Sequence, residues 1–203
     1  MKKRRKVKKS IIRETVEWTL NLAFAFTIVL LINSEVFAIT EVSGSSMEDT
    51  LIEGEKLYLN KLSYNFSDPK AGDAIVFLEG EINDGFGDRM RNTIEDIKMT
   101  LEKNPRRNRY IKRVIAVPGD KIEIRAEKVY INDKHLEEDY VKGVTFGNSI
   151  EYPLTVPEGK LFVMGDNREN SNDSRMFGLV DYKSIEGKVT YRIWPLDKIG
   201  NNL

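Results

Sequence analysis

A serine and a lysine in this sequence have the properties of a nucleophile and its base. Ser46 lies in a Gly/Ser-rich turn at residues 43–47, and Lys112 lies 66 positions later in the apolar run 110–117. A serine hydroxyl needs a base to become a good nucleophile, and a lysine held neutral can be that base. The pair predicts acyl-transfer chemistry if folding brings the two side chains together.

The strand around Lys112 determines whether its amine can be neutral. Alternation along a strand places Lys112 on the same face as Tyr110, Val114 and Ala116. A lysine on a solvated face is the simpler alternative, because lysine is normally exposed. If the face is buried, loss of hydration lowers the lysine pKa from a reference of about 10.4. A buried Lys112 could then accept the serine proton near neutral pH.

The polar segment 165–178 follows an apolar run and is rich in hydrogen-bonding side chains. Four of them would suit a calcium loop: Asp166, Asn170, Asn172 and Asp173. Arg168 and Arg175 argue against calcium, as does the lack of a spaced terminal glutamate. We therefore expect an Asp–Arg scaffold around a site, without a metal.

Cysteine is absent, and histidine occurs once, as His135. Thiol nucleophiles, disulfides and thiolate metal sites are therefore excluded. His135 follows a predicted strand in a polar segment, where we expect an exposed turn residue rather than a member of a Ser-His-Asp triad. We expect neither a histidine-rich metal site nor a cofactor.

An apolar segment near the N-terminus is long enough to cross a membrane. Charged residues are absent from 18 to 34, and apolar residues resume after Glu35. We predict a transmembrane helix at residues 16–39 with Glu35 near the outer headgroups. A cleavable signal peptide is the alternative, but the apolar core exceeds the usual 7–15 residues and no clear Ala-x-Ala site follows.

The charge beside this segment predicts its orientation. Residues 1–17 contain eight basic and two acidic residues. The positive-inside rule keeps a basic tail at 1–15 in the cytoplasm and places residues 40–203 outside, so we expect a single-pass protein of the cell membrane. Anionic lipid would favour this arrangement, and the tail does not indicate nucleic-acid binding.

Residues 40–203 are predicted to form one mainly β domain. Short runs rich in β-branched and aromatic residues alternate with Gly, Pro, Asn and Asp. The expected strands are 56–60, 73–78, 110–116, 120–125, 128–132, 160–164 and 187–193.

The charged segment 79–109 departs from the β pattern. Met90, Ile94, Ile97 and Leu101 recur in it at helical spacing. We expect an inserted amphipathic helix packed on the β domain, with the lipid surface as the alternative.

Several motifs, in order along the chain, resemble those of bacterial type I signal peptidases. They are Ser46-Met47 with Thr50-Leu51, residues 72–77, residues 110–113 with 118–120, and residues 165–168 with Ser171, Asp173, Ser174 and Arg175. The resemblance continues to residues 192–195 and so covers nearly the whole chain. It implies an antiparallel β domain at the membrane and a serine endopeptidase that cuts signal peptides after small residues, at Ala-x-Ala-like sites.

The resemblance also implies roles for individual residues. Ser46 corresponds to the nucleophile, Lys112 to the general base, and Ser171 to the residue that orients the lysine amine. Supporting ion pairs are implied for Asp173, Arg175, Arg113 and Asp166. Oxyanion or substrate contacts are implied for Gly44, Ser45, Met47, Tyr110 and Ile111.

Two residues depart from the pattern of the family. Asp49 stands where many relatives have proline, which would make the turn after Ser46 less rigid. Gly44 stands where some relatives have a serine that donates to the oxyanion. The oxyanion hole would then depend mainly on the Ser46 backbone N–H, supplemented by Ser45 or by a main-chain neighbour.

The implied partners are exported precursor proteins and membrane lipid, and the oligomeric state is not predicted. One rival is a self-cleaving Ser/Lys protease of the repressor type, which normally has a DNA-binding domain and no membrane anchor. A second rival is a catalytically silent, membrane-anchored β domain that binds precursors or translocation partners.

Overall fold

Short antiparallel strands form two sheets in the computed structural model, which describes residues 11–78, 80–83, 85–104, 107–147 and 149–201. The larger sheet has the strand order β1-β2-β11-β3-β4-β9-β10, and the smaller sheet has the order β7-β6-β5-β8. The predicted mainly β fold with one apolar N-terminal helix is confirmed.

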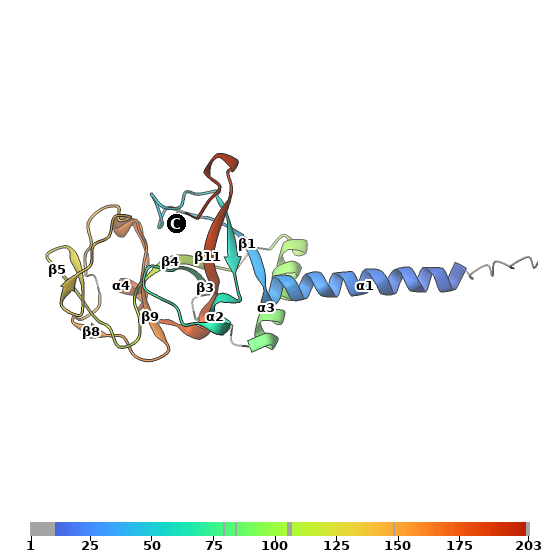
Figure 1. Ribbon diagram of the computed structural model, residues 1–203, viewed down its shortest axis with the longest axis horizontal. Coiled ribbons are helices and arrows are strands. Elements are labelled where there is room, and N and C mark those ends of the chain that lie inside the picture. Colours follow the sequence, from blue (N-terminus) through green and yellow to red (C-terminus); the bar gives the residue numbers. More distant parts are fainter. Residues whose placement is uncertain (1–10, 79, 84, 105–106, 148, 202–203) are drawn as a thin grey trace, which may run out of the picture.

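The strands are β1 Phe37–Glu41, β2 Lys56–Asn60, β3 Ala74–Leu78, β4 Arg109–Ala116, β5 Lys121–Arg125, β6 Lys128–Ile131, β7 Lys134–His135, β8 Leu154–Thr155, β9 Lys160–Met164, β10 Val180–Asp181 and β11 Ile185–Trp194. The helices are α1 Ile11–Glu35, α2 Ser63–Phe66, α3 Gly85–Glu102 and α4 Ser174–Phe177, with short 3-10 turns η1 Arg168–Asn170, η2 Tyr182–Ser184 and η3 Leu196–Lys198. Figure 1 shows the small sheet, with β5 and β8, at the end of the molecule remote from α1.

Helix α1 is long and apolar enough to cross a membrane, and no residue of its most apolar 18-residue stretch is buried in the protein. It ends at Glu35, earlier than the predicted end at residue 39. The apolar residues that follow form β1 instead, which pairs with β2, and the Phe37 ring stacks on Tyr58 with centroids 5.3 Å apart. Pairing satisfies the backbone of these β-branched and aromatic residues. Most of the predicted tail, residues 1–10, lies outside the described residues.

Strand β4 lies inside the larger sheet, between β3 and β9. Tyr110 and Val114 belong to one core cluster, as the alternation predicted. Ala116 belongs to another cluster, because the pairing with β9 shifts register between Val114 and Ala116. The irregularity lies beyond Lys112, which therefore keeps the expected face beside Tyr110.

The connection between β1 and β2 folds back onto the sheet. Val42 N–H donates to Glu55 O and Gly54 N–H donates to Val42 O, each at 2.9 Å, which closes the base of this loop. Met47 and Leu51 within it are buried in the core with Val76 of β3. Ser46 is thus held beside a core residue, although it lies in a loop.

Strands β2 and β11 approach so closely that position 187 has no room for a side chain. A Cβ on Gly187 would lie 2.6 Å from the Asn60 carbonyl oxygen. We expect Gly187→Ala to lower the free energy of unfolding by about 1–3 kcal/mol, because the backbone must move apart. Denaturant titration of the purified protein measures this. Gly200→Ala is the control, since a Cβ there meets nothing within 4 Å, and equal stability of the two variants would contradict the prediction.

Candidate active site

The fold brings Ser46 and Lys112 within hydrogen-bonding distance. Lys112 Nζ donates to Ser46 Oγ at 2.6 Å. Ser46 comes from the β1–β2 connection and Lys112 from β4, so the contact joins a loop to an interior strand. A hydroxyl and an amine at this distance satisfy the first geometric requirement for proton transfer.

The Lys112 amine is withdrawn from water. The residue is 3% exposed, and its Nζ lies 5.8 Å from the centroid of the Tyr110 ring. Burial lowers the pKa of Lys112 to about 8; Asp173 and Asp166 oppose this shift, and the charge of Arg175 adds to it. Near pH 8 about half of the amine is therefore neutral, which a solvated lysine does not achieve.

Asp166 joins three segments around the pair. Its carboxylate accepts from Arg113 Nε at 2.8 Å and Nη2 at 2.6 Å, and from Thr50 Oγ1 at 2.6 Å. Asp166 is fully buried and Arg113 is 4% exposed. The turn after Ser46, strand β4 and the loop after β9 thus meet at one carboxylate. Moving the turn would break contacts to a buried charge, which is costly.

Asp173 and Arg175 form the second buried ion pair. Arg175 donates through Nε and Nη2, both at 2.8 Å, and the Gly165 N–H donates to Asp173 at 3.0 Å. Burial alone would raise the pKa of Asp173, but the bonds and charge of Arg175 and the Gly165 N–H hold this pKa below its ordinary value. Asp173 therefore stays charged beside the Lys112 amine.

Ser171 lies next to Ser46, but the structure does not join it to Lys112. A Cβ on Gly165 would lie within 2.4 Å of both Ser171 Oγ and the Ser46 carbonyl oxygen, so these atoms flank the same glycine. The Ser171 hydroxyl is near enough to Asp173 to help lower its pKa, yet it makes no well-formed hydrogen bond to any described residue. The orienting bond to Lys112 that the resemblance implies stays a prediction.

Two asparagines hold the turn of Ser46. The sequence analysis gave Asn167 no role and considered Asn170 only as part of a calcium loop. Asn167 donates its backbone N–H to Ser46 O and its side-chain amide to Ser45 O, both at 3.1 Å. Asn170 Nδ2 donates to Ser45 Oγ at 2.6 Å. Gly44 has φ +81°, a left-handed angle that glycine adopts readily, as expected for this turn.

Glu138 is another residue that the sequence analysis missed. It receives Arg168 Nη1 at 2.9 Å and Nη2 at 2.5 Å, and both side chains are almost fully buried. Arg168 also donates Nε to Gly165 O at 3.1 Å. A buried Arg168 requires a carboxylate partner, but the sequence offers 32 acidic residues and no signal that selects this one.

Lys142 holds the part of the turn in which Asp49 replaces the usual proline. Its Nζ lies 3.1 Å from Asp49 Oδ1 and 3.3 Å from Glu48 Oε2. The Lys142 backbone also bonds to the loop after β9, donating to Asp166 O and accepting from Arg168 N–H, each at 2.8 Å. The turn is thus linked to that loop by contacts that a proline would not make.

A groove of about 1270 Å³ runs from the end of α1 to the Ser46–Lys112 pair. Its walls include β1, part of α3 and the first half of β4. All five residues for which oxyanion or substrate contacts were expected line it: Gly44, Ser45, Met47, Tyr110 and Ile111. The groove therefore offers space beside the pair for a peptide segment.

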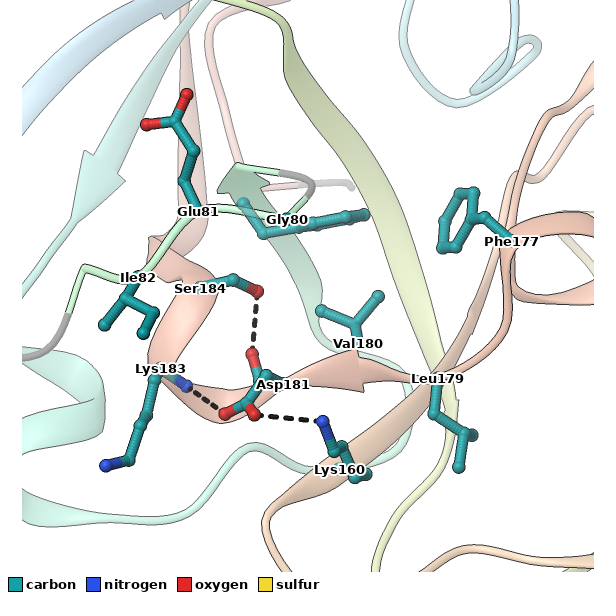
Figure 2. Close-up of a pocket in the computed structure, with 11 residues that line it drawn as sticks. Gly80, Glu81, Ile82, Lys160, Phe177, Leu179, Val180, Asp181, Lys183 and Ser184 are labelled. Atoms are coloured by element: carbon teal, nitrogen blue, oxygen red, sulfur yellow. Dashed lines mark hydrogen bonds and ion pairs between the residues drawn. The ribbon is translucent and has the colours of Figure 1, made fainter.

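A second hollow, of about 420 Å³, lies elsewhere, between β10 and the start of the 79–109 segment. Figure 2 shows Asp181 among the residues that line it, where Asp181 accepts from Lys160 Nζ at 3.0 Å and from the Lys183 N–H at 2.9 Å. The other acidic residue that lines it, Glu81, pairs with Arg107 at 3.0 Å, so both carboxylates are already bonded. Neither Ser46 nor Lys112 lines this hollow. We assign it no chemistry.

Within the described ranges, no group of three or more His, Asp or Glu side chains could hold a metal ion. Asp166 and Asp173, which a calcium loop would use, are bonded to arginines. His135 is exposed in β7, where its ring lies 5.6 Å from that of Tyr130. It is too exposed and too distant in the fold to assist Ser46.

Comparisons with known proteins agree on one family. The chain matches the family model "Signal peptidase, peptidase S26" over residues 15–194. It is 31% identical over 206 residues to signal peptidase IB of Staphylococcus aureus, covering 94% of this chain and 95% of that protein. It is 32% identical over 160 residues to the probable signal peptidase I-2 of Synechocystis, covering 78% of this chain and 64% of that protein. A solved signal peptidase I of Enterococcus faecalis is 32% identical and covers 61% of this chain and 98% of its own, with a TM-score of 0.42.

The buried amine should reduce stability below its pKa. The unfolded chain binds the Lys112 proton with an ordinary pKa of 10.5, whereas the folded pKa is about 8. The destabilisation is therefore complete below about pH 8 and is lost as the pH rises to 10.5. We expect Lys112→Met to be more stable than the parent by about 1–3 kcal/mol at pH 7, with the difference shrinking at higher pH.

Denaturant titration at several pH values measures this difference. Lys134→Met, at an exposed position in β7, is the control and should show no such pH dependence. A Lys112→Met protein that is less stable than the parent by the same amount at every pH would contradict the assigned pKa shift.

Proposed function

Because the chain belongs to the signal peptidase family, peptidase S26, it is a serine peptidase that removes signal peptides, and we propose that Ser46 is its nucleophile and Lys112 its general base. The observation that carries this proposal is the 2.6 Å contact between Ser46 Oγ and the buried Lys112 Nζ. Burial supplies the neutral amine, and the contact supplies the path for the proton.

The proposed reaction has two steps. In the first, neutral Lys112 takes the Ser46 proton while Oγ attacks the scissile carbonyl carbon, and the lysine then gives that proton to the leaving amine. The C–N bond breaks and an acyl ester forms on Ser46. In the second, Lys112 takes a proton from water, the hydroxide attacks the ester, and the proton returns to Ser46 Oγ as the new C-terminus leaves.

The backbone N–H of Ser46 is our candidate for the main oxyanion donor. It donates to no other residue in the described part of the chain, so it is available to a developing negative charge. Gly44 has no side-chain donor, and we propose that the Ser45 hydroxyl supplements the hole. Because Ser45 Oγ accepts from Asn170, its own proton stays free to donate.

We propose that the precursor binds in the groove as an extended strand. β1 lies at an edge of the larger sheet and lines the groove, so its free edge can pair with a peptide backbone. Alternate side chains of an extended peptide point to the same side. Buried Met47 and half-buried Ile111 would thus contact two alternate substrate residues, which supports cleavage after small residues at Ala-x-Ala-like sites.

We propose a single-pass arrangement with residues 1–15, including the start of α1, in the cytoplasm, the rest of α1 across the membrane and a catalytic domain at 40–203 outside. The apolar helix and the basic residues before it support this orientation. The groove extends to Asn33 near the end of α1. A cut site would therefore lie close to the bilayer from which a signal peptide emerges.

Replacing either member of the pair should abolish cleavage. We expect Ser46→Ala and Lys112→Ala each to lose at least about a thousandfold in kcat, because each removes a group that bonds or moves a proton at the reacting centre. The assay is processing of a purified precursor by the full-length protein in lipid vesicles. Exposed Ser67→Ala and Lys134→Ala are matched controls and should cut as the parent does.

Other outcomes of the same assay are informative. If the parent binds the precursor but leaves it uncut, the chain is a catalytically silent binding domain. If Ser46→Ala and Lys112→Ala both cut as fast as the parent, the dyad assignment is wrong.

The rate should follow the protonation of Lys112. Since only the neutral amine accepts the serine proton, kcat/KM should rise about tenfold per pH unit below pH 8 and level off above it. Initial rates between pH 6 and 10 give this profile, with circular dichroism verifying that the fold persists. A rate that does not change across this range would contradict a buried, neutral Lys112 as the base. A rate that rises with an apparent pKa near 10.5 would contradict it too.

A further inference from the structure

Helix α3 exposes its apolar face and turns its polar face toward the protein, the reverse of a helix packed on a protein core. Five of its apolar residues form one stripe at helical spacing: Phe86, Met90, Ile94, Ile97 and Leu101. Met99 lies off this stripe and is half-buried. Ile94 is 50% exposed and Leu101 is 79% exposed, whereas the buried residue of this helix is Asn92. The prediction that the apolar face packs on the β domain is therefore wrong, and the polar face packs there instead.

Ion pairs, and a hydrogen bond to the side-chain amide of an asparagine, fix α3 in this orientation. Arg107 donates to Asn92 Oδ1 at 2.6 Å and also pairs with Glu95. Arg109, at the start of β4, pairs with Asp96 on the helix and with the buried Glu186. Rolling the helix to bury its stripe would separate these charges from their partners. The apolar stripe is thus held outward by the domain.

The position of α3 relative to α1 indicates what the stripe meets. Arg89 of α3 pairs with Glu35, the last residue of α1, at 2.7 Å, and the two helices are in contact. Figure 1 shows α3 running across the domain end of α1, rather than alongside it. If α1 crosses the bilayer, α3 therefore lies along the surface of that bilayer, at the level of Glu35.

The basic residues beside the apolar stripe of α3 are of the kind found in the headgroup region of a bilayer. Lys98 and Arg91 follow the apolar residues around the helix, with side chains 69% and 60% exposed. Each also pairs with an acidic residue of the same helix, Lys98 with Glu102 at 3.8 Å and Arg91 with Asp88 at 2.9 Å. Long basic side chains beside an apolar stripe can cover it with their stems while their charged ends reach lipid phosphates.

We propose that α3 is an interfacial helix whose apolar stripe inserts into the outer leaflet beside α1. The exposed stripe, the fixed polar face and the contact with α1 together carry this proposal, which stands whether or not Ser46 is the nucleophile. Ile97 and Thr93 also line the groove that leads to Ser46. The inserted helix therefore forms the lipid-side wall of that groove and holds its mouth at the membrane.

Site-directed labelling of the full-length protein tests this directly, because the chain contains no cysteine. Single-cysteine variants Ile94→Cys and Leu101→Cys carry an environment-sensitive fluorophore, with Lys134→Cys as the exposed control in the remote small sheet. The labelled proteins are reconstituted at low density in vesicles of phosphatidylglycerol and phosphatidylcholine. Quenching is measured with aqueous iodide and, separately, with nitroxide-bearing lipid.

We expect the labels at 94 and 101 to be quenched by the lipid nitroxide and to be roughly fivefold less sensitive to iodide than the label at 134. Equal iodide sensitivity at the three positions would overturn the proposal. Protection from iodide without quenching by lipid would also overturn it, because the stripe would then be covered by protein, such as a second copy of the chain.

Discussion

The contact between a buried amine and a serine hydroxyl is the constraint on which the rest of this structure depends. Lys112 lies in the interior strand β4, with 3% of its surface exposed, and its Nζ is 2.6 Å from Ser46 Oγ. Placing an ammonium group there is unfavourable, and this lowers its pKa to about 8. The same desolvation that disfavours folding below this pH would provide the neutral amine that the proposed mechanism needs.

The surrounding ion pairs position Ser46 and Lys112, and their charges act on the Lys112 amine in opposite directions. Asp166 and Asp173 both favour the protonated lysine, whereas Arg175 disfavours it. Each carboxylate is bonded to an arginine, Asp166 to Arg113 and Asp173 to Arg175. An unpaired carboxylate at either place would raise the lysine pKa. The loop after β9 thus combines a structural role with an electrostatic one.

The sequence predicted the features of the structure that depend on neighbouring residues, and it did not predict contacts between distant segments. Runs of β-branched and aromatic residues predicted strands such as β4. The sequence left the burial of Lys112 as one of two alternatives, and the structure places this residue in the interior. Glu138 could not be identified, because its pairing with Arg168 depends on folding two segments 30 positions apart. The orientation of α3 was predicted wrongly, because periodicity identifies a stripe and not the surface that it meets. The end of α1 was misplaced because residues 36–39 are apolar enough for either a membrane helix or strand β1.

One groove extends from Asn33, near the end of the candidate membrane helix α1, to Ser46 of the proposed catalytic pair. The proposed activity depends on the charge state of a single amine, that of Lys112. Nitrogen-15 NMR titration of Lys112 in the intact protein, with Lys112→Arg to assign the signal, tests this most directly. The account predicts that the amine loses its proton near pH 8. A midpoint near 10.5, the ordinary lysine value, would contradict it.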